Sequence, residues 1–247
     1  MQNLKGKVAL VTGSARRIGA MTVQALHQAG ATVVVHYRNS VKDAEELAAK
    51  LNSIRPDSCY LQQAELSDIS QLSKMIDDII RQAGRLDILI NNASTFFATP
   101  LGEITEEHWD NLMGSNLKAP LFLSQAAAPE LMKNHGCIVN MVDIHGIRPL
   151  KEHSVYSSAK AGLLLLTQSL ARELGPNVRV NGVAPGAILW PENESGTNEQ
   201  SAILKKTCLK REGSPEDITK AILFLVCDAD YITGHVIPVD GGRLLNH

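Results

Sequence analysis

The sequence predicts an α/β fold, a doubly wound parallel sheet of about seven strands that forms a single domain over residues 1–247. Short runs rich in β-branched residues alternate with longer stretches of helical period, which is typical of repeated strand–helix units. The short runs are almost continuously apolar, as strands buried on both faces are. A chain of 247 residues with 44% hydrophobic residues is also long enough for one large core.

The strands and helices can be placed in order from their local signals. Asp68 is a typical N-cap for a helix that ends at Gly84, and Ser214 with Pro215 and Glu216 is typical of another helix start. Residues 155–174 have the helical period of a third helix. The strands are expected at residues 8–13, 32–38, 58–66, 86–94, 137–143, 178–186 and 234–242.

Residues 187–213 interrupt this alternation. The segment is rich in polar and turn-forming residues before a short helical piece, so we predict a mobile substrate flap. Trp190 lies within this segment, and two alternatives stay open for it. It either closes over the substrate, or it lies at the surface or in a subunit contact. The flap is where we expect substrate choice to be made.

Composition excludes several classes of partner. A formal net charge of -2 gives no electrostatic reason to expect nucleic acid or an anionic membrane. The four cysteines lack the paired spacing of a zinc or redox site, and no two histidines share the i, i+4 spacing of a zinc helix, so no metal is predicted. With no secretory segment at the start and no apolar stretch long enough for a bilayer, a cytoplasmic protein with free thiols is expected.

The stretch TGSARRIG, residues 12–19, follows the first predicted strand and opens a helix. Gly13 permits a tight turn and Gly19 close helix packing, which leaves the first helical amides free to face a pyrophosphate. Arg17 stands where such loops usually have a middle glycine. A guanidinium there adds a fixed cation with five hydrogen-bond donors to the loop.

The second predicted strand ends in His36, Tyr37, Arg38, Asn39 and Ser40. An acid expected about 20 residues after the glycine loop, where it would bind a ribose 2′-hydroxyl, is missing. A cation and hydroxyl groups suit a 2′-phosphate instead, so NADP(H) is predicted over NAD(H).

Tyr156 and Lys160 lie four residues apart on one face of the helix predicted at 155–174. A phenol titrates near ~10 in water, and a nearby ammonium favours its ionised form. The pair therefore suits proton transfer, although such spacing is common on helices that carry no chemistry.

The motifs that accompany Tyr156 and Lys160 elsewhere in the chain are more specific than the spacing of this pair. With TGSARRIG, NNAS at 91–94, Asn116 in GSNLKAP, APG at 184–186 and YITGHVIPVDGG at 231–242, the chain resembles the short-chain dehydrogenase/reductase family over nearly its whole length. The resemblance implies a Rossmann-type fold, a homotetramer and a catalytic set that includes Asn116, Tyr156 and Lys160. Asp143 stands where the family usually has serine. A carboxylate beside the phenol opposes its ionisation, which favours proton donation and hence a reductase.

Arg17, HYRNS, NNASTFFATPL and Asp143 together look like the pteridine reductase branch of that family. This resemblance implies a pterin or folate substrate that stacks between the nicotinamide and Phe96, and NADPH as cofactor. The implied substrate-binding residues are Arg17, Ser94, Phe96, Asp143 and Tyr156. The expected cofactor-binding residues are Gly13, Arg17, Ile18, Gly19, His36, Tyr37, Arg38, Asn39, Ser40, Glu65, Leu66, Asn92, Ala93, Ser94, Met141, Tyr156, Lys160, Pro185 and Gly186.

These expectations give a reductase in which NADPH delivers a hydride to a C=N bond of the ring and Tyr156 passes a proton to the neighbouring nitrogen. Two alternatives stay open. One is a 3-oxoacyl or ketone reductase of the same family, which needs no stacking surface. The other is a non-catalytic NADP(H)-binding sensor, which would consume no cofactor.

Overall fold

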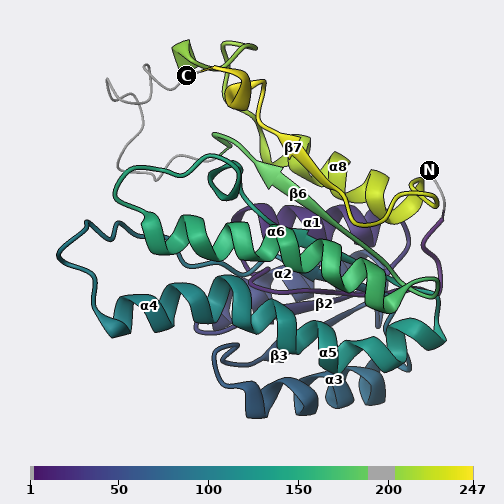
Figure 1. Cartoon of the computed structure of the whole chain (residues 1–247). Helices are drawn as coiled ribbons and strands as arrows, with labels where there is room; N and C mark the ends of the chain where they lie inside the picture. Colours follow the sequence, from purple (N-terminus) through teal and green to yellow (C-terminus); the bar gives the residue numbers. More distant parts are fainter. Residues whose placement is uncertain (1–2, 189–203, 247) are drawn as a thin grey trace.

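Residues 3–188 and 204–246 are described by the computed structural model. At its centre is a seven-stranded parallel sheet in the order β3-β2-β1-β4-β5-β6-β7, which confirms the predicted doubly wound fold (Figure 1). The strand order reverses between β1 and β4, because the chain returns from β3 to the other side of β1. The strands are β1 Val8–Val11, β2 Thr32–Tyr37, β3 Cys59–Gln63, β4 Ile88–Asn91, β5 Cys137–Met141, β6 Arg179–Pro185 and β7 Val236–Val239.

Helices cover both faces of the sheet (Figure 1). One face carries α1 Arg17–Gln28, α2 Val41–Ile54 and α8 Pro215–Cys227. The other carries α3 Ile69–Ala83, α5 Ala119–Lys133 and α6 Ser154–Leu174. A shorter helix, α4 Glu106–Met113, runs through a π-helical turn, η1 Gly114–Lys118, directly into α5. Two short 3-10 helices, η2 Ile144–Gly146 and η3 Arg243–Leu245, complete the described elements.

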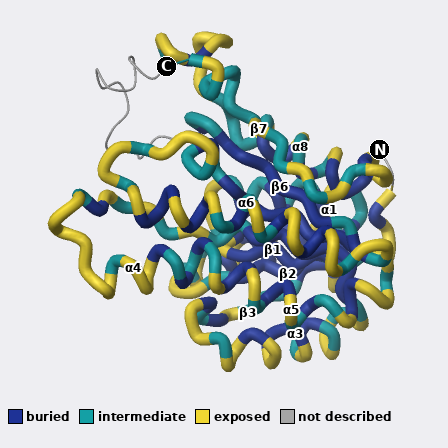
Figure 2. Tube along the Cα trace, in the orientation of Figure 1, coloured by how far each residue is buried: buried dark blue, intermediate teal, exposed yellow. Residues whose placement is uncertain are grey.

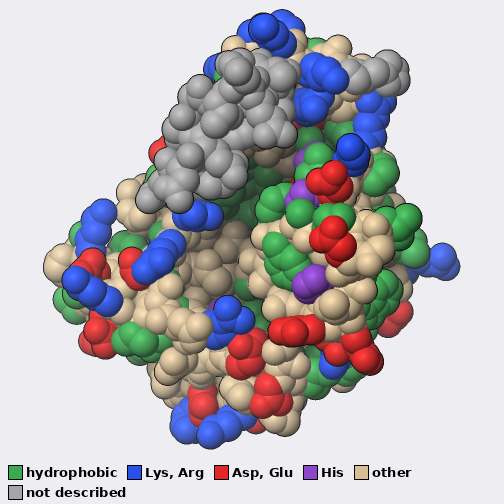
Figure 3. Space-filling model, turned by 90° about the vertical axis from the view of Figure 1, so that its left-hand side faces the viewer, with side chains coloured by type: hydrophobic (Ala, Val, Ile, Leu, Met, Phe, Trp, Pro, Cys, Tyr) green, Lys and Arg blue, Asp and Glu red, His purple; other side chains and the backbone are tan. Residues whose placement is uncertain are grey.

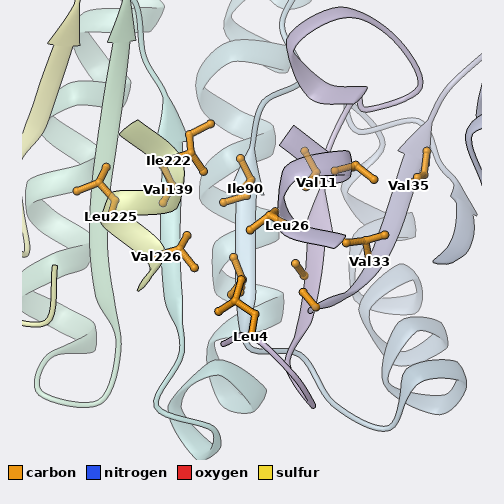
Figure 4. Close-up of a cluster of buried hydrophobic side chains, with 14 of the residues drawn as sticks. Leu4, Val11, Leu26, Val33, Val35, Ile90, Val139, Ile222, Leu225 and Val226 are labelled. Atoms are coloured by element: carbon orange, nitrogen blue, oxygen red, sulfur yellow. The ribbon is translucent and has the colours of Figure 1, made fainter. Parts of the chain in front are cut away.

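The apolar core lies in two layers, because successive side chains of a strand point to opposite faces of the sheet. Ala9 and Val11 of β1 pack with α1, α2 and α8, whereas Leu10 packs with α3, α5 and α6. Figure 4 shows part of the first layer, where Leu26 of α1 and Ile222 of α8 lie over the strands. The central strands β1, β4, β5 and β6 are among the most deeply buried parts of the molecule, whereas the edge strands β3 and β7 are only partly buried (Figure 2). This rigid centre holds the loops at the strand ends in place.

The predicted helix signals are confirmed. The Asp68 side chain accepts the amide of Ser70 at 3.1 Å, and Gly84 ends α3 in the left-handed conformation at φ 80°. Ser214 and Asp217 form a reciprocal capping box at the start of α8. No helix of the described ranges is long and apolar enough to cross a membrane.

Several predicted strands were too long at their carboxyl ends. The predicted strand 86–94 ends at Asn91, and the predicted strand 58–66 ends at Gln63. Beyond β4 the amides of Asn92 and Ala93 bond to the Thr12 hydroxyl at 2.9 and 3.0 Å instead of to a neighbouring strand. The excess residues therefore form loops. Of the predicted flap, residues 189–203, including Trp190, lie outside the described residues.

Candidate active site

A cavity of about 640 Å³ opens at the carboxyl ends of the strands. It lies beside β1 and β4, where the strand order reverses, and open parallel sheets bind ligands at this position because neighbouring loops diverge there. Figure 3 views the molecule from this side, where the surface is hollowed. The predicted residues that line the cavity are Gly13, Arg17, Ile18, Gly19, His36, Tyr37, Arg38, Asn39, Ser40, Glu65, Leu66, Asn92, Ala93, Ser94, Met141, Asp143, Tyr156, Lys160, Pro185 and Gly186.

The junction between the glycine loop and α1 has a glycine-like backbone although an arginine occupies it. Arg17 has φ 54°, in the left-handed region that glycine adopts without cost, and its side chain lines the cavity. Gly19 is tightly enclosed, since a Cβ there would meet the Gly13 oxygen at 2.6 Å. The amides of Arg17, Ile18 and Gly19 belong to the first helical turn and have no intrahelical acceptor. The loop thus combines a favourable position for an anion with a guanidinium.

His36 fixes this loop through a hydrogen bond with the Gly13 amide. Its ring is buried, its Nδ1 accepts the amide of Gly13 at 3.0 Å, and its Nε2 lies 3.2 Å from the carbonyl oxygen of Ala64. Because the carbonyl can only accept, Nε2 carries the proton and the ring is neutral. Burial lowers the pKa of His36 to about 4, an effect that the hydrogen bond to Ala64 and the charge of Glu65 partly oppose. The predicted cofactor residue therefore acts by fixing the loop.

We expect stability to depend on pH through His36. Its pKa is lower in the folded chain than the ordinary 6.5, so the unfolded chain binds the proton first as pH falls. The contribution of His36 to the free energy of unfolding is complete above pH 6.5 and is lost as the pH falls towards 4. The loss amounts to about 3 kcal/mol, since each pKa unit of difference corresponds to 1.36 kcal/mol. Urea unfolding measured across this pH range should show that the free energy of unfolding of His36→Asn depends less steeply on pH than that of the unchanged protein. His135→Asn, at an exposed position, serves as control, and an equal slope in His36→Asn and the unchanged protein contradicts the prediction.

Two arginines stand at the rim beside the end of β2. Arg38, predicted from the sequence, forms an ion pair with Glu65, in which Arg38 Nη1 lies 3.4 Å from Glu65 Oε2. Arg16 also lines the cavity and was missed, although its place one residue before Arg17 was a usable signal. Its Nη2 donates to Asp43 Oδ2 at 2.6 Å, and this bond holds the pKa of the Asp43 carboxyl below its ordinary value. Both guanidiniums are exposed and can exchange these weak surface pairs for a phosphate.

Tyr156 and Asp143 form the central contact of the site. The phenol donates its proton to Asp143 Oδ2 at 2.7 Å, and Asp143 Oδ1 accepts the amide of His145 at 2.8 Å. Burial raises the pKa of Tyr156 above its ordinary value, and the charge of Asp143 and the hydrogen bond to it raise the pKa further. A hydrogen bond from Ser94 acts in the opposite direction. The phenol is therefore held in its protonated, donating form, as the sequence predicts for a carboxylate at position 143.

Lys160 lies one helical turn after Tyr156 and is buried. Its Nζ donates to the Met141 carbonyl at 2.8 Å and lies 5.7 Å from the centroid of the Tyr156 ring. Burial lowers the pKa of Lys160 to about 8, while the charge of Asp143 acts to raise it. Asp143 thus stabilises the ammonium and the neutral phenol together, because its negative charge faces both groups.

Asn116 lies outside the cavity lining, buried in the π-helical turn η1. Its Nδ2 donates to the carbonyls of Leu112 and Thr95, both at 2.9 Å, and its Oδ1 accepts the Ser94 hydroxyl at 2.6 Å. The side chain therefore fixes the loop after β4 and aims the Ser94 oxygen. The predicted place of Asn116 on the proton path stays a prediction.

Phe96 lies at the margin of the site and is not among the residues that line the cavity. Its ring meets Tyr156 nearly at a right angle, with 4.8 Å between ring centroids, and stacks on His153 at 4.6 Å. The structure thus brings Phe96 to Tyr156, although not into the cavity lining, and its stacking on a substrate stays a prediction. The stacking partner His153 was missed, because nothing in the sequence pairs the loop after β4 with the start of α6.

These features determine what the site can do chemically. A parallel sheet with an anion-binding glycine loop and a buried, protonated phenol beside a lysine defines an oxidoreductase of the doubly wound α/β class. In the described ranges no group of three or more His, Cys, Asp or Glu side chains is arranged to hold a metal ion.

Comparisons with known proteins agree with this class. A family model described as enoyl-(acyl carrier protein) reductase matches residues 13–243. Pteridine reductase 1 of Leishmania tarentolae is 37% identical over 278 positions, which cover 96% of each chain. The 3-oxoacyl-(acyl-carrier-protein) reductase of Thermotoga maritima is 35% identical over 252 positions, covering 98% of this chain and 99% of the relative. A solved structure of a blue fluorescent protein from a metagenomic library, in complex with NADPH, has a TM-score of 0.92 at 33% identity, covering 98% of this chain and 99% of that one.

The chain therefore belongs to the short-chain dehydrogenase/reductase family, as its motifs predict.

Proposed function

We propose that the protein is an NADPH-dependent reductase of pterins or folates. The observation that carries the proposal is the hydrogen bond between Tyr156 and the Asp143 carboxylate, which keeps the phenol protonated inside the cavity. The pterin-reducing relative at 37% identity supports the same activity. Reduction of a C=N bond needs a proton donor at the ring nitrogen, and Tyr156 meets that need.

The residues present fit NADPH. Three arginines, Arg16, Arg17 and Arg38, line one cavity together with the first amides of α1, which is the donor chemistry that phosphates require. Arg38 and Arg16 would hold the 2′-phosphate, and Lys160 would bind the nicotinamide ribose. The relative that was solved with NADPH supports this cofactor. When bound, NADPH supplies the hydride.

The chain's own groups perform the proton transfer. Tyr156 gives its proton to the substrate nitrogen, and the Asp143 carboxylate then takes up a proton from solvent and passes it to the phenolate oxygen that it already contacts. Arg17 binds the acceptor-rich edge of the pterin, while Phe96 offers its flat surface to the ring. Ser94, whose hydroxyl is bound by Asn116, acts to lower the pKa of the phenol and so opposes part of the effect of Asp143.

The test is NADPH oxidation with dihydrobiopterin, dihydromonapterin, dihydrofolate and fully oxidised pterins, beside an acetoacetyl thioester. We expect the pterins or folates to be reduced, with inhibition by a methotrexate-like antifolate that competes with them. Turnover of the thioester alone, indifferent to the antifolate, would instead identify the oxoacyl reductase that the Thermotoga relative exemplifies. NADPH binding without turnover of any of these substrates would identify a sensor. The cytoplasmic location and the homotetramer stay predictions.

Arg17 offers a matched pair of substitutions. Arg17→Ala and Arg17→Gly both remove the guanidinium, so both should raise KM for a dihydropterin by about tenfold or more, as loss of a charged hydrogen bond implies. Only glycine suits φ 54°, so Arg17→Gly should be more stable than Arg17→Ala by about 1 kcal/mol. Steady-state kinetics and urea unfolding of the two variants check this. An unchanged KM in both would remove Arg17 from the substrate site.

A further inference from the structure

The ring of Phe96 is held from two sides and still offers surface. One flat face lies parallel to the imidazole of His153, with ring centroids 4.6 Å apart and 14° between the planes. The Tyr156 ring approaches at 81°, with centroids 4.8 Å apart. Phe96 nevertheless remains 56% exposed, so much of its aromatic surface is uncovered beside the phenol that donates the proton. That surface is available to a flat ligand.

His153 is fixed by contacts that do not involve Phe96. It is the N-cap residue of α6, three positions before Tyr156, and its carbonyl accepts the amide of Ser157 at 2.9 Å. Its Nδ1 lies 2.8 Å from the carbonyl oxygen of Lys151, so Nδ1 carries the proton. The imidazole therefore has a set orientation relative to the helix that carries Tyr156.

The loop that carries Phe96 is anchored at both ends. Before the phenylalanine, Asn116 bonds to Ser94 and to the Thr95 carbonyl. After it, Thr99 pairs with His153 in an isolated parallel bridge, and the Thr99 amide donates to the Glu152 carbonyl. Between these anchors, the stack on His153 and the contact with Tyr156 orient the exposed ring.

We propose that His153 is a positioning and specificity-determining residue, which supports Phe96 from behind so that its open surface selects flat heteroaromatic substrates next to Tyr156. The inference rests on the proposed function. A ring that is already ordered loses less rotamer freedom when the substrate stacks on it. A small ketone gains nothing from a flat surface, so the support given by His153 matters only for ring substrates.

The kinetic test uses His153→Ala, His153→Phe and Phe96→Leu. His153→Ala should raise KM for a dihydropterin by about five- to tenfold with little change in kcat, as loss of an aromatic pair implies. His153→Phe keeps a flat ring and should restore KM. In the Phe96→Leu background His153→Ala should have no further effect, because the ring that it supports is absent. Affinity for NADPH and thermal unfolding confirm that each variant is folded, and His135→Asn is the control for loss of an exposed imidazole.

A second readout needs no substrate. In the free protein labelled at its histidine rings, the Phe96 ring current should shift the His153 resonance upfield, and Phe96→Leu should abolish that shift. The signal is assigned by its loss in His153→Phe. Absence of the shift overturns the stack on which the inference depends.

The kinetic outcomes separate the two proposals. An unchanged KM in His153→Ala overturns the inference and leaves the proposed function intact. A lowered KM also overturns it, because His153 would then cover the surface that the substrate needs. If the unchanged protein reduces no pterin or folate, the proposed function fails, and the substrate role of His153 fails with it even where the ring-current shift is present.

Discussion

Tyr156→Phe is expected to lower kcat for NADPH-dependent pterin reduction by about 10²- to 10⁴-fold, the usual contribution of a positioned proton donor. The phenol is buried, donates to Asp143 at 2.7 Å and has a raised pKa, so it is fully protonated at neutral pH. Phenylalanine keeps the ring that contacts Phe96 and removes only the hydroxyl. Affinity for NADPH and for the dihydropterin should therefore change much less than kcat. Steady-state kinetics with a separate measurement of cofactor binding checks both expectations.

Tyr231→Phe is the matched control, because the same hydroxyl is removed from a fully exposed side chain. It should leave turnover unchanged. Turnover by Tyr156→Phe within a few-fold of the unchanged protein would contradict the role of Tyr156 and would require a proton from solvent.

The parts of the site that follow from residue type and regular spacing could be predicted from the sequence. Four-residue spacing places Tyr156 and Lys160 on one face of a helix, and the family motifs elsewhere in the chain indicated that this face belongs to the site. Both residues line the cavity. The glycines of the first loop and the position of Asp143 after β5 were predictable because parallel strands deliver their carboxyl ends to one edge of the sheet. The strand limits were less accurate, since hydroxyl and amide side chains such as Thr12 replaced strand pairing in the loops.

Contacts between distant loops could not be predicted in this way. The stack of His153 on Phe96 depends on how the loop after β4 meets α6, and neither hydrophobic period nor spacing signals that contact. The hydrogen bonds of Asn116 depend on a π-helical turn between two ordinary helices, for which the sequence shows no distinct period. Arg16, in contrast, could have been predicted to line the cavity, because the charge argument that placed its neighbour Arg17 there applies equally to it.

Asp143→Asn is expected to lower kcat by about 100-fold, within the range for loss of a group that supplies protons. The amide can still accept the phenol hydrogen bond in the arrangement seen, but it cannot take up a proton from solvent and pass it to the Tyr156 oxygen after transfer. The substitution also removes the charge that acts to raise the pKa of Lys160, so this pKa should fall below its value of about 8. Because the ammonium of Lys160 is the form that binds the ribose hydroxyls most strongly, the loss of activity with rising pH should begin at lower pH in the variant. Asp110→Asn, an exposed change of the same kind, should alter neither kcat nor the pH profile. An alkaline limb that stays in place in Asp143→Asn would show that Asp143 acts on the phenol alone.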